Sequence, residues 1–76
     1  MINVTVILPD NADGVDVRVP VGETVQQFAD MLAETYQVKI GEHVAMTSAM
    51  SGETYTTYDR ITTETFVSGD TVILRG

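Results

Sequence analysis

The chain has 76 residues, no cysteine, one histidine and a formal net charge of −7 at pH 7. A chain this short buries roughly 60% of its unfolded surface, so we expect one domain over residues 1–76, with one sheet on one helix and no deep substrate cleft. Without cysteine, disulfides, thiolate nucleophiles and cysteine-rich zinc sites are excluded, and a lone histidine cannot make a usual zinc site.

The eleven acidic residues are spread along the chain and outnumber the four basic ones. Direct binding to nucleic acid or to anionic lipid needs clustered lysine and arginine, so we expect neither, whereas a basic protein partner is compatible with this charge. No apolar run approaches the ~18 residues of a membrane span, and the N-terminus lacks a basic, cleavable leader. We therefore expect no direct membrane insertion and, because disulfides are missing, a cytoplasmic location.

Two strands open the chain. Residues 2–8 alternate between apolar side chains on one face and a second face that carries Thr5 and Ile7. Turn-forming residues fill positions 9–14, and valine at every second position predicts another strand over residues 15–21. The two strands are close enough in the sequence to form a hairpin.

A helix follows, with Thr24 as its N-cap and Gln27 three residues later, which is the spacing of a capping box. The apolar residues after this cap recur at helical spacing and predict one buried stripe. The helix should end near Gln37. The residues of the stripe are Val25, Phe28, Leu32 and Tyr36.

The second half of the chain predicts short strands over residues 43–47, 54–57 and 71–74, with Ile61 entering the core from an irregular segment. The fold class is therefore α+β, a mixed sheet of four to five strands packed on one α-helix. The expected core consists of Val4, Val6, Val17, Val19, Phe28, Leu32, Val72 and Leu74.

The sequence gives little indication of a catalytic, metal or cofactor site. His43 would meet Ser48 or Ser51 only by coincidence of the fold, so we expect no enzyme and no catalytic residue. Residues 10–16 offer oxygen ligands of the calcium-loop type but lack a glutamate at the required spacing, so we expect a hairpin loop and no metal. No phosphate-binding loop is present, and we expect no cofactor.

One surface feature stands out. Thr5, Ile7 and Ile73 fall on the outward faces of the first and last strands. If those strands pair, the two isoleucines make a small apolar patch on the open side of the sheet, which is a candidate protein-binding site. The alternative is that these are scattered surface residues, which are common.

Five segments distributed over almost the full length carry a resemblance to a known family, and they are Val4–Val6, Asp16–Pro20, Glu23–Val25, Asp59–Ile61 and Val67–Leu74. They resemble the ubiquitin-like β-grasp superfamily, and within it the YukD/EsaB family and the related N-terminal ubiquitin-like domain of EccD, both of bacterial type VII (WXG-protein) secretion. The resemblance implies first and last strands paired in parallel at the sheet centre. It also implies a non-enzymatic cytosolic accessory or regulatory protein that binds components of the secretion machinery.

The last residues, Leu74, Arg75 and Gly76, keep an alternative open. They look like the end of a ubiquitin-type modifier that is activated and conjugated through Gly76. Modifiers typically end in two glycines, and this chain has one at that position. A third hypothesis is that the chain is a subdomain of a larger protein.

We predict that Gly76 is not conjugated to other proteins. Activation requires an accessible, flexible carboxylate, and the last strand is expected to run to about Leu74. An N-terminally tagged form expressed in its native host should give a single species on a denaturing gel. A ladder of covalent higher-mass species that disappears on deletion of Gly76 would contradict this prediction and favour the modifier hypothesis.

Overall fold

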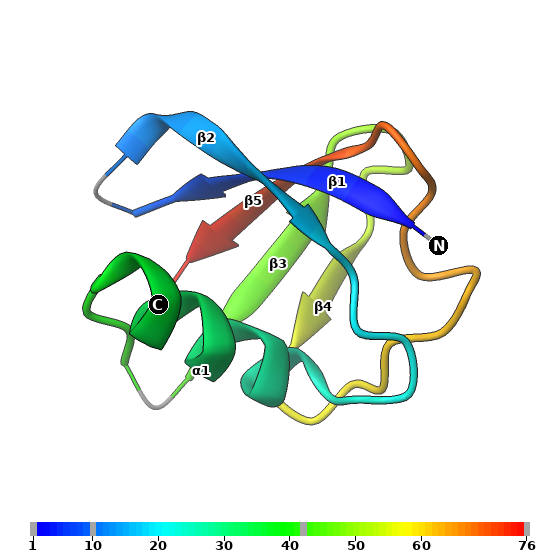
Figure 1. The fold of residues 1–76 in the computed structure, drawn as a ribbon. Helices are drawn as coiled ribbons and strands as arrows, with labels where there is room; N and C mark the ends of the chain where they lie inside the picture. Colours follow the sequence, from blue (N-terminus) through cyan, green and yellow to red (C-terminus); the bar gives the residue numbers. More distant parts are fainter. Residues whose placement is uncertain (1, 10, 42, 76) are drawn as a thin grey trace.

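The computed structural model describes residues 2–9, 11–41 and 43–75. Within them the chain forms a mixed five-stranded sheet in the order β2-β1-β5-β3-β4, with one helix across one face (Figure 1). The α+β class is therefore confirmed. The elements are β1 (Asn3–Leu8), β2 (Asn11–Arg18), α1 (Val25–Tyr36), β3 (Ala45–Ser48), β4 (Thr54–Thr56) and β5 (Thr71–Arg75).

The sheet is built around β1 and β5, which come from opposite ends of the chain and pair in parallel (Figure 1). Val6 lies beside Val72 in this pair. Each of the two strands also has an antiparallel neighbour, β2 beside β1 and β3 beside β5. Both central strands therefore have their backbone groups paired on two sides, and the alternation of their side chains decides which residues enter the core.

The β1–β2 hairpin is tighter than the sequence predicted. Leu8 pairs with Asn11, so β2 starts four residues earlier than expected, and it ends at Arg18, before Pro20. The register shifts between Val6 and Leu8, and Gly14 has a φ of 79° at this irregularity. The residues that were interpreted as a turn therefore form the irregular first part of β2. Glycine with a positive φ is common both in loops and in β-bulges, so the sequence pattern did not separate the two. Of residues 10–16, which were predicted to form a hairpin loop without a metal, Asp10 lies outside the described residues.

The capping box at the start of α1 is confirmed. The Gln27 amide donates to Thr24 Oγ1 at 3.2 Å, and the Thr24 amide donates to Gln27 Oε1 at 2.8 Å. The helix ends at Tyr36, where Gln37 takes the left-handed conformation and its amide bonds to the Ala33 carbonyl. The cap at each helix end is local, whereas the Val25 and Gln26 amides donate to the carbonyls of Asp59 and Thr57 in the segment after β4.

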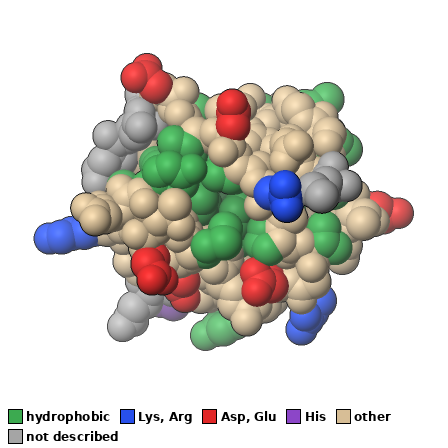
Figure 2. Space-filling view, in the orientation of Figure 1, with side chains coloured by type: hydrophobic (Ala, Val, Ile, Leu, Met, Phe, Trp, Pro, Cys, Tyr) green, Lys and Arg blue, Asp and Glu red, His purple; other side chains and the backbone are tan. Residues whose placement is uncertain are grey.

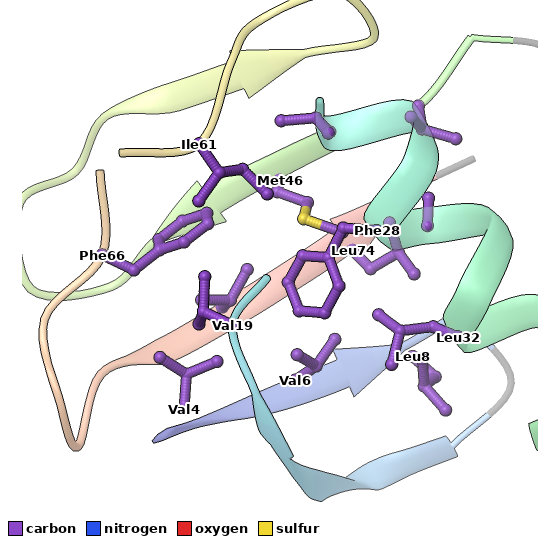
Figure 3. Packing of buried hydrophobic residues seen from close by; sticks show 14 residues of the cluster. Val4, Val6, Leu8, Val19, Phe28, Leu32, Met46, Ile61, Phe66 and Leu74 are labelled. Carbon is purple, nitrogen blue, oxygen red and sulfur yellow. The ribbon is translucent and has the colours of Figure 1, made fainter. Parts of the chain in front are cut away.

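The core lies between α1 and the inner face of the sheet, and Figure 3 shows Phe28 and Leu32 of the helix among side chains from the strands. Seven of the eight expected core residues are buried; Val17 is half-buried and packs against the cluster. Tyr36 was wrongly placed in the buried stripe, because it sits at the last helical position and 39% of it is exposed. Ile61 is fully buried, as predicted.

The structure adds a core residue that the sequence pattern did not reveal. Phe66 is 1% exposed, and its ring meets that of Tyr55 edge to face with centroids 5.5 Å apart. It comes from the irregular segment between β4 and β5, where no periodicity points to an inward side. The strand predicted from residue 43 begins instead at Ala45, although Val44 before it is buried.

We predict that Leu32→Ala lowers the free energy of unfolding by about 2–5 kcal/mol, because it leaves a cavity in the closed core. The matched control is Met31→Ala on the same helix, where 41% of the side chain is exposed; it should cost less than about 1 kcal/mol. Urea unfolding followed by circular dichroism measures both. Equal losses for the two variants would show that Leu32 is not part of a closely packed core.

Candidate protein-binding face

The helix covers one face of the sheet and leaves the other face open (Figure 1). Along β1, β3 and β5, buried residues alternate with residues that point to this open face. On the two edge strands the inward residues are half-buried and pack against the core, and they are Val15, Val17 and Tyr55. The strand residues on the open face include Asn3, Thr5, Ile7, Asp16, Arg18, Ala45, Thr47, Thr54, Thr56, Thr71, Ile73 and Arg75.

The centre of the open face is an isoleucine pair. Ile7 of β1 and Ile73 of β5 are direct partners in the parallel register, and each is half-buried. Thr5 lies two residues before Ile7 on the same strand and opposite Thr71. The structure therefore brings together the three residues that the sequence singled out, in the middle of a face that no element of the described chain covers.

Gly14 on β2 leaves the space that the Ile7 side chain occupies on the open face. A Cβ atom built at Gly14 would lie 2.9 Å from Ile7 Cδ1 and 2.9 Å from Thr5 Cγ2, so these two side chains rest on the glycine. Its positive φ also disfavours any other residue. The sequence analysis missed this role, and the signal that could have revealed it is a glycine inside a strand, which often marks close approach.

Hydroxyl groups surround the isoleucine pair. Thr5 Oγ1 donates to Asp16 Oδ1 at 2.7 Å, and the hydroxyls of Thr47 and Thr54 are 3.0 Å apart. Thr47 is also the neighbour of Ile73 across the β3–β5 pair. The face thus offers an apolar centre with a polar rim, which is the anatomy of a protein contact surface.

The residues weighed for catalysis do not meet. His43 precedes β3 and is exposed, whereas Ser48 is the last residue of that strand and is buried. The Ser48 hydroxyl donates to the Asp70 carboxylate instead. Within the described ranges, no three histidine, aspartate or glutamate side chains cluster in a way that could hold a metal ion.

Asp70 and Ser48 form a buried polar link that the sequence analysis missed, since the segment that contains Asp70 was interpreted as a plain turn. Both residues are 1% exposed. Asp70 Oδ1 accepts the Met50 amide at 3.2 Å, and Ser48 Oγ accepts the Ser51 amide at 3.3 Å. The link joins the turn after β3 to the start of β5, and so supports the strand that carries Ile73.

The C-terminal residues belong to the sheet further than predicted. Leu74 is buried, and Arg75 is the last residue of β5, opposite Ala45 of β3. The prediction that the strand stops near Leu74 is therefore one residue short, because pairing with β3 continues. Gly76, the residue of the modifier hypothesis, lies outside the described residues.

Comparisons of this chain with known protein families, with curated proteins and with solved structures gave no match. Among the described residues, no helix has the length and apolar character needed to cross a membrane. The candidate face therefore stands on the geometry of the sheet alone.

We predict that Asp70→Ala lowers the free energy of unfolding by about 1–3 kcal/mol, because it leaves the buried Ser48 hydroxyl and the part-buried Met50 amide without their acceptor. Asp70→Asn keeps one acceptor oxygen and should cost less. Hydrogen exchange of the Met50 amide should accelerate in the alanine variant. Unchanged exchange together with unchanged stability would show that this link does not hold the turn.

Proposed function

We propose that this protein is a non-enzymatic protein-interaction module that binds its partner through the open face of the sheet. The observation that carries the proposal is the isoleucine pair, Ile7 and Ile73, in direct register on an uncovered face and supported from below by Gly14. Thr5 forms part of the rim of this contact surface. A pair of β-branched apolar side chains set in place by the backbone loses little side-chain entropy on binding, which favours its use as an anchor.

The proposed fold family is the ubiquitin-like β-grasp. Support comes from the parallel pairing of the first and last strands at the sheet centre and from the single helix across one face. The resemblance of the sequence segments to the YukD/EsaB family extends the proposal to a role as a cytoplasmic accessory protein of type VII secretion, with a component of that machinery as partner.

The chemistry of the face defines the partner. Its centre is apolar and its rim consists mostly of threonine hydroxyls, while the whole chain carries a net charge of −7. A partner with an apolar anchor residue and basic residues around it would fit both features, because the anchor fills the centre and the charges attract the acidic protein.

We predict that Ile73→Glu weakens partner binding by at least about tenfold, equivalent to about 1.4 kcal/mol, because it places a charge in the centre of the contact. The control is Val67→Glu, which adds the same charge at a residue outside the strands that is 46% exposed. Binding to purified cytosolic domains of the secretion machinery from the same host can be measured by calorimetry. Circular dichroism checks that both variants fold.

Two outcomes would contradict different parts of the proposal. If folded Ile73→Glu binds as well as the wild type, the isoleucine pair is not the contact surface. If the wild type binds none of the secretion components, the assignment to type VII secretion fails, and the open face keeps its support as a contact surface for another partner.

A further inference from the structure

The second surface of interest is the free edge of the sheet at β2. The strand order places β2 at one end of the sheet, with β1 as its neighbour on one side (Figure 1). An edge strand presents unpaired N–H and C=O groups that can pair with another strand. The unpaired backbone groups of this edge are distinct from the Ile7–Ile73 pair, although Asp16 and Arg18 also lie on the open face, so the inference goes beyond the proposed function.

The register shows which backbone groups are free. The Val19 amide donates to the Ile2 carbonyl at 2.8 Å, and Val17 lies opposite Val4. Hydrogen-bonded and non-bonded pairs alternate along an antiparallel ladder. The backbone groups of Val17 and Val19 therefore face β1, and those of Asp16 and Arg18 point to the free edge.

An apolar groove of about 430 Å³ lies next to this edge, between β2 and α1. Figure 2 shows hydrophobic side chains gathered in the middle of this side of the molecule. The apolar residues that line the groove are Val17, Val19, Pro20, Met31, Leu32 and Tyr36. Met31 and Tyr36 are 41% and 39% exposed, so a strand added to β2 would cover apolar surface as well as backbone groups.

We propose that the occupant of this edge is a second copy of the chain, bound by antiparallel pairing of β2 with β2 about a two-fold axis at Val17. In this arrangement Asp16 of each copy lies opposite Arg18 of the other, and the free N–H and C=O groups of these residues bond across the axis. Opposite charges directly across two strands stabilise the pair. The β2 edges of two copies are thus complementary to each other, both in their free backbone groups and in the charges of Asp16 and Arg18.

Both side chains are available for this contact. Asp16 and Arg18 are exposed and point to the open side of the sheet. Asp16 Oδ1 accepts the Thr5 hydroxyl, which leaves the second carboxylate oxygen for a guanidinium, and the Arg18 side chain has no hydrogen bond or ion pair within the described chain. The two Val17 residues form the non-bonded pair at the axis, on the side of the groove.

The neighbouring registers are unfavourable. Centring the pair on Asp16 places two carboxylates opposite each other, and centring it on Arg18 places two guanidinium groups together. The second of these also sets Asp16 against Pro20, which has no amide hydrogen to donate. A shift by one residue turns the free backbone groups of one copy toward the bonded groups of the other. Charge and backbone pattern therefore select the same register.

The net charge of −7 on each copy opposes association. At physiological ionic strength the screening length is about 8 Å, so the groups at the edge outweigh the distant carboxylates. We therefore expect a dimer that forms at high protein concentration and weakens at very low salt, where the long-range repulsion is no longer screened.

The test combines charge-reversal variants with sedimentation in the analytical ultracentrifuge at about 0.15 M salt. The wild type should dimerise with rising concentration, whereas Asp16→Arg alone and Arg18→Asp alone should stay monomeric, because each sets like charges across the axis. An equal mixture of the two variants should associate again, and so should the double variant. Glu53→Arg is the control for Asp16→Arg. It also replaces an acidic residue by arginine, but on an exposed residue just before β4, and it should leave the dimer unaltered.

A cysteine at the axis checks the register directly. The chain has no cysteine of its own, so Val17→Cys supplies a single thiol. Non-bonded antiparallel pairs bring Cα atoms to about 4.5 Å, which is within the range of a disulfide. Under mild oxidation Val17→Cys should form a covalent dimer at least about tenfold faster than Met50→Cys, whose side chain is more exposed but lies away from β2.

The proposal is overturned if the folded wild type remains monomeric at millimolar concentration, which would leave the edge to a strand from another protein. It is also overturned if the single charge variants dimerise like the wild type, or if their mixture fails to associate. Equal crosslinking rates at positions 17 and 50 would reject the register. Because Asp16→Arg makes the chain less acidic, general repulsion cannot account for a loss of the dimer in that variant.

Discussion

The parallel pairing of β1 with β5 is the contact on which the rest of the structure depends. It joins the two ends of the chain and leaves Val6 and Val72 fully buried beneath the helix. Because successive side chains in a strand point to opposite faces, the same register that closes the core also sets Ile7 beside Ile73 on the outside. The candidate face is thus a direct consequence of the pairing that holds the fold together.

The open face and the β2 edge arise because a single sheet with one helix leaves one face uncovered and its edge strands unpaired on one side. One helix covers one face, so the opposite face stays open, and β2 at the end of the strand order keeps one side of its backbone unpaired. Pairing at the β2 edge would extend the sheet and place two copies of the Ile7–Ile73 face on one continuous surface. A partner with two binding segments would then gain from the raised effective concentration.

The segment between β4 and β5 shows how residues without regular structure are held in place. The Ile61 amide donates to the Glu23 carbonyl at 2.7 Å, and the Gly22 amide donates to the Ile61 carbonyl at 2.8 Å. These bonds fasten the segment to the residues before α1, while Ile61 and Phe66 fill the core beneath it. Asp70 completes the connection through Ser48, so that the start of β5 is held by a buried polar contact as well as by the ladder.

Local patterns in the sequence by themselves determined that the hairpin strands exist, though not where β2 begins and ends, together with the capped helix and most of the core, because two-residue alternation and the Thr24–Gln27 box depend on neighbours along the chain. They also placed Ile7 and Ile73 on outward faces. The tertiary structure alone decided that these isoleucines are partners, that Gly14 supports Ile7, and that Phe66 and Asp70 are buried while Tyr36 is half exposed. Those outcomes depend on contacts between residues far apart in the sequence, where irregular segments carry no periodic signal to indicate which side faces the core.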